Sequence, residues 1–422
     1  MRAKMLVVVP VFVLILGACT VGGTVRPEPT GSSPASDVLL VDTDRGPIAI
    51  SSGTGAVLSD GLGAVAGPDG SRLYAATRDG MHTQLVTIEA TTGAVASSIR
   101  MRGELDVRVA SLSGKAVALM APLPAGVDPW TPVPRSRTTI VVADPAGSSE
   151  PHRYHLKGNF EPEAFSVEDS RLFLIQYLPA EAPAVYRVTV LDLRDGDVYA
   201  VHGRFKTAPE RMPGIRLRQV FDAQTSQLYT LYTTKPRAYA QDYGSWNHGD
   251  EPETFVHVLN LQKGWAYCAG LPKELWGQPA ASQTMATSPD GKLLYIVDST
   301  KGVVSVMDTH TLEILRTEHA ALTSPDGVRT SAQVSADGRT LFVGSLGDGS
   351  MVDVIDTTTF AIEHHWTMAA IVLGLGLSDD GLRLYVGQRE GVTILDALTG
   401  AELTAVPVLG VESILHVGTL DA

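Results

Sequence analysis

The chain has 422 residues, a formal net charge of −13 and a charged fraction of only 19%. This acidic balance argues against non-specific binding to nucleic acid or to anionic lipid head groups, so no nucleic-acid partner is expected. The chain also contains 41 glycines and 25 prolines. Since no apolar period of 3.6 residues continues beyond the extreme N-terminus, the composition favours many short strands joined by turns.

Residues 1–18 have the pattern of a secretory signal peptide. Two basic residues precede an apolar run of eleven residues, 6–16. As a helix this run would rise about 16 Å, which is too short for a hydrocarbon core of about 30 Å. The segment Leu16-Gly17-Ala18-Cys19 resembles the lipobox of bacterial lipoproteins, which implies that Cys19 carries the lipid and becomes the mature N-terminus. The alternative is an ordinary signal peptide in which the cysteine is incidental.

Residues 19–36 are interpreted as a lipidated, flexible tether. They are rich in Gly, Pro, Ser and Thr and contain almost nothing apolar, so they cannot bury enough surface to fold. The folded body, 37–422, is then expected to be lipid-anchored to the cell membrane on its extracytoplasmic side. Cys268 lies in a strand-like run and is interpreted as a buried, unreactive thiol.

A short repeat marks this body. Its clear copies place an Asp-Gly turn before an apolar strand, at 288–297, 335–344 and 378–387, and a fainter copy occupies 67–76. The Asp-Gly pairs recur after 47 and then 43 residues, the spacing of a four-stranded propeller blade. A tight turn is expected at each pair, because Asp tolerates the left-handed backbone region and Gly adopts it without penalty.

Each clear copy continues into an alternating strand that ends in Asp308, Asp356 or Asp396. A short carboxylate at the start of a turn is expected to accept hydrogen bonds from nearby backbone N–H groups. The alternative is calcium binding, but no cluster of further acidic ligands accompanies these aspartates.

Seven complete repeat units follow one another along the chain, at 65–99, 106–156, 163–202, 216–269, 282–317, 330–368 and 372–406. Two incomplete segments remain: 38–58 supplies three strands without a first, and 411–417 supplies a first strand without successors. Pairing them would close the ring and remove the exposed sheet edge of an open array. The prediction is an all-β propeller of eight four-stranded antiparallel blades, with seven blades as the alternative.

The clear copies resemble YVTN-type β-propeller repeats, a WD40-like architecture named for the tetrapeptide that Tyr295-Ile296-Val297-Asp298 occupies here. None of the copies carries that tetrapeptide itself. The resemblance implies the propeller fold, and some propellers of this kind are lactonases or other hydrolases.

Long insertions gather in three consecutive units, at 121–137, 178–184 and 233–254, and the connections 206–214 and 270–280 are also enlarged. In a propeller all five would leave from one face. Loops of this length are usually functional or disordered, and exposed aromatic side chains among polar ones are typical of recognition surfaces. The candidate binding residues in these loops are Trp130, Tyr239, Tyr243, Trp246, His248 and Asp250. The alternative is a loop whose aromatic side chains merely cover the neighbouring insertion.

Charged residues near the starts of the innermost strands form a second candidate site, with Glu163 and Arg216 as its candidate binding pair. The others are Asp106, Arg218, Arg329 and Glu412. Such a ring either binds a small polar molecule or satisfies itself through ion pairs. The sequence carries no covalent-haem, nucleophile-elbow, zinc-protease or phosphate-loop motif, so no catalytic residue, metal or other cofactor is assigned. The predicted function is a binding or scaffold module for a protein, peptide or glycan. The alternative is a lactonase-like propeller hydrolase with its site at the channel mouth.

Overall fold

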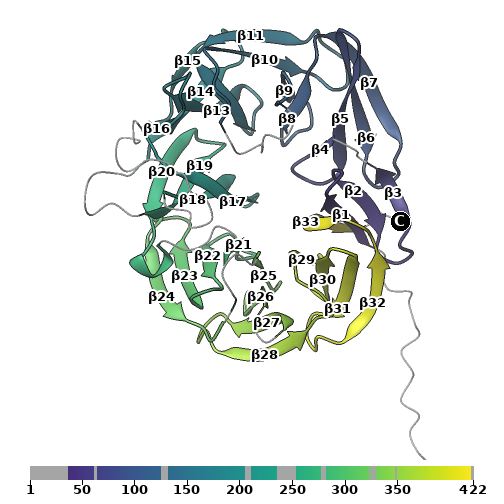
Figure 1. Cartoon of the computed structure of the whole chain (residues 1–422), viewed down its shortest axis with the longest axis vertical. Helices are drawn as coiled ribbons and strands as arrows, with labels where there is room; N and C mark the ends of the chain where they lie inside the picture. The colour runs from purple at the N-terminus through teal and green to yellow at the C-terminus, as the bar shows by residue number, and fades with distance from the viewer. Residues whose placement is uncertain are drawn as a thin grey trace, which may run out of the picture. The chain divides into compact units, whose positions relative to one another are not determined.

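The computed structural model describes residues 37–60, 64–124, 132–204, 211–234, 253–276, 282–322, 324, 329–346 and 349–419. They form eight β-sheets, and the single-turn 3-10 helix η1 (Lys273–Leu275) is the one helical element in these ranges. Figure 1 shows the sheets arranged radially, as the blades of a ring. The predicted all-β propeller with eight blades is confirmed, and the seven-blade alternative is wrong.

Each of the first four blades begins with an inner strand at the centre of the ring. Blade 1 consists of β4 (Ala64–Ala66), β5 (Arg72–Asp79), β6 (His82–Glu89) and β7 (Val95–Arg102). Blade 2 consists of β8 (Asp106–Ala110), β9 (Val117–Met120), β10 (Arg137–Ala143) and β11 (His152–Lys157). Blade 3 consists of β12 (Asn159–Phe165), β13 (Arg171–Leu178), β14 (Val185–Asp192) and β15 (Val198–Ala200). Blade 4 consists of β17 (Ile215–Asp222), β18 (Gln227–Thr233), β19 (Thr254–Asn260) and β20 (Trp265–Gly270), with β16 (His202–Gly203) at its rim.

The remaining blades complete the ring. Blade 5 consists of β21 (Gln283–Thr287), β22 (Leu293–Asp298), β23 (Val303–Asp308) and β24 (Ile314–His319). Blade 6 consists of β25 (Ser331–Val334), β26 (Thr340–Leu346), β27 (Ser350–Asp356) and β28 (Ile362–Thr367). Blade 7 consists of β29 (Gly374–Leu377), β30 (Arg383–Gln388), β31 (Gly391–Asp396) and β32 (Glu402–Pro407). Blade 8 joins β33 (Val411–Thr419) to β1 (Asp37–Thr43), β2 (Ile48–Ser51) and β3 (Val57–Asp60).

The two ends of the described chain share blade 8, as predicted. Its inner strand β33 runs antiparallel to β1, from the pair Asp37–Thr419 to the pair Thr43–Val411. Figure 1 shows the purple first strand beside the yellow last one. This pairing gives β1 a neighbour on both sides and leaves no open edge at the junction.

Apolar side chains pack between neighbouring blades. The described residues form eight hydrophobic clusters, one at each junction between successive blades. A middle strand therefore buries both of its faces, and all seven residues of β18 and all seven of β19 are buried. Burial on both faces explains why neither strand contains an Asp, Glu, Lys or Arg residue.

The Asp-Gly turns are confirmed, but their conformation differs from the expected one. Gly291, Gly338 and Gly381 adopt φ values of 67°, 74° and 70°, whereas the aspartates before them do not enter the left-handed region. Each aspartate is instead an acceptor, and Asp290 Oδ1 accepts bonds from Ser288 Oγ at 2.7 Å and from the Lys292 N–H at 3.1 Å. A single left-handed residue at the glycine suffices for this turn, so the carboxylate is free to bridge it.

The predicted role of the aspartates between the third and fourth strands is confirmed. Asp308 accepts bonds from the backbone N–H groups of residues 310 and 311 at 2.8 and 2.7 Å. Asp356 and Asp396 repeat this arrangement. These bonds stabilise the ionised carboxylate and lower the pKa of all three side chains.

The boundary between blades 3 and 4 differs from the prediction. The third unit was expected to end at His202, but β15 ends at Ala200 and His202 pairs with Trp265 as part of the short parallel strand β16. The boundary depends on tertiary contacts, because residues 202 and 203 form backbone hydrogen bonds with the outer edge of β20.

Blades 2, 3 and 4 depart from the regular repeat in two ways. Their second and third strands are joined by the long insertions, which leave the same face because successive strands alternate in direction. Their inner strands are also bulged, between Val107 and Val109, between Pro162 and Ala164, and between Arg216 and Arg218. The inner strands of blades 5, 6 and 7 pair without any register shift.

Candidate functional site

The candidate loop residues lie outside the described part of the chain. These are Trp130, Tyr239, Tyr243, Trp246, His248 and Asp250, and the proposed lipidation site Cys19 lies outside it as well. Glu163 and Arg216 are described, and they meet.

Glu163 and Arg216 form a buried ion pair between the inner strands of blades 3 and 4. The Nη2 atom of Arg216 lies 2.7 Å from Oε2 of Glu163, and their side chains are 14% and 3% exposed. Gln219 donates a second hydrogen bond to the Glu163 carboxylate at 2.8 Å. At this position the charged residues are therefore neutralised by ion pairs within the protein, which was the alternative to ligand binding. The same holds for Asp106, which pairs with Arg78 at 2.7 Å.

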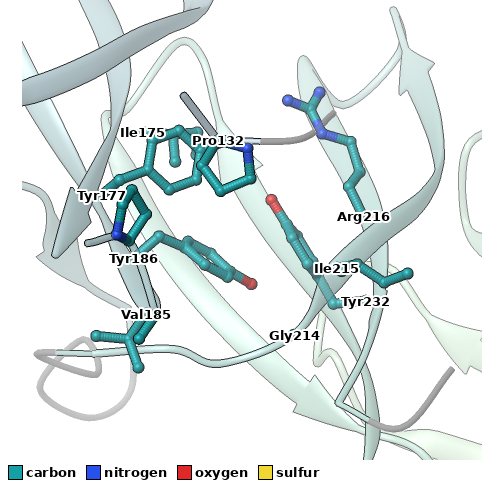
Figure 2. Close-up of a pocket in the computed structure, with 11 residues that line it drawn as sticks. Pro132, Ile175, Tyr177, Val185, Tyr186, Gly214, Ile215, Arg216 and Tyr232 are labelled. Atoms are coloured by element: carbon teal, nitrogen blue, oxygen red, sulfur yellow. The ribbon is translucent and has the colours of Figure 1, made fainter. Parts of the chain in front are cut away.

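A recess opens beside Arg216, where blades 2, 3 and 4 converge on the insertion-bearing face. Its volume is about 490 Å³, counting its open mouth. Figure 2 shows three tyrosine side chains, a proline and Arg216 around it. Its described lining consists of Pro132, Ile175, Tyr177, Pro183, Ala184, Val185, Tyr186, Gly214, Ile215, Arg216 and Tyr232.

The strand ends position the tyrosines. Tyr177 is the second-to-last residue of β13 and Tyr232 the second-to-last of β18, so each stands just before an insertion. Tyr186 is the second residue of β14, just after an insertion. The sequence interpretation missed these residues because strand tyrosines are commonly core residues. Their position beside the insertions was the available signal.

Two of the tyrosines form a buried aromatic stack with Phe255. The ring centroids of Tyr186 and Tyr232 lie 4.9 Å apart, and Tyr232 stacks on Phe255 at 5.4 Å with an interplanar angle of 10°. Burial raises the pKa of Tyr177 to about 12 and raises the pKa of Tyr186 and of Tyr232 well above the ordinary value. All three phenols are therefore neutral hydrogen-bonding groups near pH 7.

One of these hydroxyl groups has no hydrogen-bond partner of normal geometry among the described residues. Tyr186 is only 3% exposed, and its Oη makes no hydrogen bond to any residue that the structure describes. Figure 2 shows this hydroxyl directed into the recess. A buried polar group without a partner costs about 1–3 kcal/mol, which a ligand bound there would recover.

The described stems of the first two insertions are held against this site. Arg135, in the first insertion, pairs with Glu161 of β12 at 3.0 Å. Asn159 donates to the carbonyls of Val133 and Ala180 at 2.8 and 3.1 Å, joining the two insertions. These contacts give the recess fixed walls.

A second cavity lies in the central channel. Its volume is about 960 Å³, counting open solvent, and it is lined by the inner strands of blades 4 to 8. Arg218 and Arg329 both line it, so the structure separates Arg218 from its close sequence neighbour Arg216. The bulge in β17 explains the separation: Arg216 pairs with Tyr232 and Arg218 with Leu231, and these adjacent partners face opposite sides of blade 4.

Metal and membrane features were also sought in the described ranges. No group of three or more His, Cys, Asp or Glu side chains there is placed to hold a metal ion. Within the same ranges no helix combines the length and apolar character needed to span a membrane. Cys268 is partly buried, with its Sγ 3.2 Å from the Met212 sulfur, and it has no metal-ligand cluster around it.

Comparison with known proteins supports the fold. No protein-family model and no curated protein matches the chain. Among solved structures, the dihydro-heme d1 dehydrogenase NirN in complex with DHE is 16% identical with a TM-score of 0.53, and the match covers 93% of this chain and 77% of that chain. Apo AztD from Citrobacter koseri is 11% identical with a TM-score of 0.54, covering 92% and 99%.

The chain shares the β-propeller fold of these proteins. The periplasmic gluconolactonase PpgL of Pseudomonas aeruginosa is 16% identical, covers 91% and 99%, and has a TM-score of only 0.41. Sequence identities this low show a shared fold and say nothing about which ligand this chain binds.

Proposed function

We propose that this protein is a lipid-anchored, extracytoplasmic β-propeller of YVTN type that binds a protein, peptide or glycan through its insertion-bearing face. The observation that carries the binding role is the recess at the convergence of blades 2, 3 and 4. It combines a buried aromatic stack, the partnerless Tyr186 hydroxyl and the charged Arg216, bounded by the stems of two insertions. Aromatic side chains with a few converging polar groups are typical of binding sites.

The anchoring part of the proposal rests on the lipobox-like segment ending in Cys19 and on the Pro/Gly-rich residues after it. It is tested by expressing the full chain and Cys19→Ala in a bacterial host with a labelled fatty acid. Label and membrane association are expected for the wild-type chain and should both be lost in the variant. A wild-type chain without label would contradict the anchor and leave the binding role standing.

The alternative function is a lactonase-like hydrolase with its site at the channel mouth. The Glu163 carboxylate there is engaged by Arg216 and Gln219, and no observation on the described residues favours hydrolysis.

The binding role is tested with the full chain in detergent, probed against peptide and glycan arrays. Tyr186→Phe removes only the partnerless hydroxyl, so the affinity for the arrayed ligand should fall by roughly three- to tenfold while the free energy of unfolding rises by about 1 kcal/mol. Tyr199→Phe is the matched control, because Tyr199 is 38% exposed on the rim strand β15. If the wild type binds neither array, or if Tyr186→Phe binds as well as the wild type, the recess is not the binding site.

A further inference from the structure

Two arginines in the central channel have no carboxylate partner among the residues that the structure describes. Arg218 makes only a 3.3 Å hydrogen bond to the carbonyl of Leu217, its neighbour in the chain. Arg329 makes no hydrogen bond or ion pair with a residue that the structure describes. Other partly buried arginines behave differently, since Arg216 pairs with Glu163 and Arg383 pairs with Asp37 at 3.0 Å.

The two guanidinium groups repel each other electrostatically. Burial is the larger of two effects that lower the pKa of Arg218 to about 10, and the charge of Arg329 is the second. Two half-buried like charges destabilise the empty channel, because each is partly removed from water and repels the other. Both charged side chains that line the cavity are therefore positive, in a protein whose net charge is −13.

Two acidic residues lie within electrostatic range of this site without forming an ion pair with Arg329 among the described contacts. Burial, the largest effect, and Glu412 both raise the pKa of Asp42, whereas Arg329 lowers it. The charge of Arg329 thus acts on Asp42 from a distance, but the two side chains form no ion pair among the described contacts. Glu412, the neighbour of Asp42, disfavours a second full negative charge at this place.

The cavity also offers neutral hydrogen-bond donors. The hydroxyl oxygen of Ser331 lines it and accepts a bond from the Leu375 N–H at 3.0 Å, so the hydroxyl proton is left to donate. Thr284, from the neighbouring inner strand, lines the same cavity. About 340 Å³ of this space is open to water-sized groups, which is ample for a small organic anion.

We propose that the central channel binds a small oxyanion, a phosphate or a carboxylate group, between Arg218 and Arg329. Planar guanidinium groups match both anion types through paired hydrogen bonds. The site uses residues on the inner strands of blades 4 to 6, together with Arg329 just before β25. It is therefore separate from the recess beside Arg216 and does not rest on the partner-binding role proposed above.

The test is isothermal titration of the full chain in detergent with inorganic phosphate and, separately, with succinate, at constant ionic strength. Saturable binding of at least one anion is expected, and the comparison of the two identifies the preferred group. Arg218→Gln and Arg329→Gln should each weaken binding about tenfold, the loss expected for a charged hydrogen-bonding partner. Arg100→Gln is the control, because Arg100 is 60% exposed and pairs with Asp79 at the surface.

A second measurement covers the case in which a variant folds poorly. Phosphate should raise the melting temperature of the wild type above that in chloride of equal ionic strength. Without added anion, Arg218→Gln should melt no lower than the wild type, because an unpaired charge has been removed. The proposal would be overturned if neither anion binds or stabilises the wild type. It would also be overturned if the variant that combines Arg218→Gln and Arg329→Gln still binds the anion. Tyr186→Phe should leave anion binding unchanged, which separates this outcome from failure of the recess.

Discussion

His257 shows how burial of one residue couples stability to pH. It lies on the middle strand β19, is 4% exposed and packs edge-on against Tyr232 at 6.4 Å between ring centroids. Burial, with a smaller contribution from Arg216, lowers its pKa from the ordinary 6.5 to about 4. The folded protein therefore keeps His257 neutral in a range where the unfolded chain takes up a proton.

The sign of the pH effect follows from this difference. As pH falls from 6.5 to 4, His257 becomes protonated in the unfolded chain but stays neutral in the folded protein. This difference favours the unfolded state, so His257 alone should lower the free energy of unfolding by about 3 kcal/mol. Urea titrations at pH 7, 5.5 and 4.5 measure the drop. His257→Gln should flatten the pH dependence by that amount, whereas His202→Gln, on the exposed rim of blade 4, should follow the wild type. If the free energy of unfolding falls with pH equally in His257→Gln and in the wild type, His257 is not the cause of the pH dependence.

At the scale of the element, the first-to-second-strand turn needs one left-handed residue. At Gly338 the φ value is 74° and a Cβ would meet nothing closer than Pro289 Cδ at 3.9 Å. Space is therefore available, and the cost of a side chain there comes from the backbone conformation itself.

Gly338→Ala is accordingly expected to lower the free energy of unfolding by about 1 kcal/mol, and Gly338→Asn by less, because Asn visits the left-handed region more readily. Gly349→Ala is the control, since a Cβ there has open space and its φ is not in the strained region. Denaturant unfolding measures all three. Equal effects of Ala and Asn at position 338 would point to a lost contact and not to backbone strain.

The bulged inner strands also belong to this scale. Blades 2, 3 and 4 combine a bulge with an insertion, and the recess lies where these three blades converge. A bulge redirects the side chains that follow it, and in β17 it sends Arg216 to the recess and Arg218 to the channel. The sequence shows the insertions because they add residues, but it does not show the bulges, whose position depends on the pairing of neighbouring strands.

For the whole molecule, closure of the ring depends on the strand that begins the described chain. The Asp37 carboxylate of β1 is fully buried and pairs with Arg383 of the adjacent blade 7 at 3.0 Å, and it also accepts a bond from the Tyr385 hydroxyl. These contacts bind blade 8 to blade 7 next to the β1–β33 ladder.

Asp37→Ala leaves the largely buried Arg383 charge with only the more exposed Asp380, at 3.2 Å, as an acidic partner. The free energy of unfolding should therefore fall by about 3 kcal/mol, the lower end for a broken buried pair. Adding Arg383→Met should recover part of this loss, because the stranded charge is then absent. Asp79→Ala, which breaks the exposed pair with Arg100, should change stability by less than about 1 kcal/mol. Chemical unfolding, followed by size-exclusion chromatography, measures both stability and ring integrity. A loss for Asp37→Ala no greater than that for Asp79→Ala would contradict this role in closure.

The sequence by itself determined the blade repeat, the shared blade of the two chain ends, and the aspartates that accept hydrogen bonds in the turn after the third strand of each clear copy. It favoured eight blades over seven. These features are local or periodic, because turn chemistry and strand alternation act over a few residues and recur. Only the tertiary structure decided that Glu163 pairs with Arg216, that three strand-end tyrosines converge, and that Arg218 and Arg329 line the same cavity. Those contacts join residues from different blades, and their geometry depends on bulges and on blade-to-blade packing that no single stretch of sequence encodes.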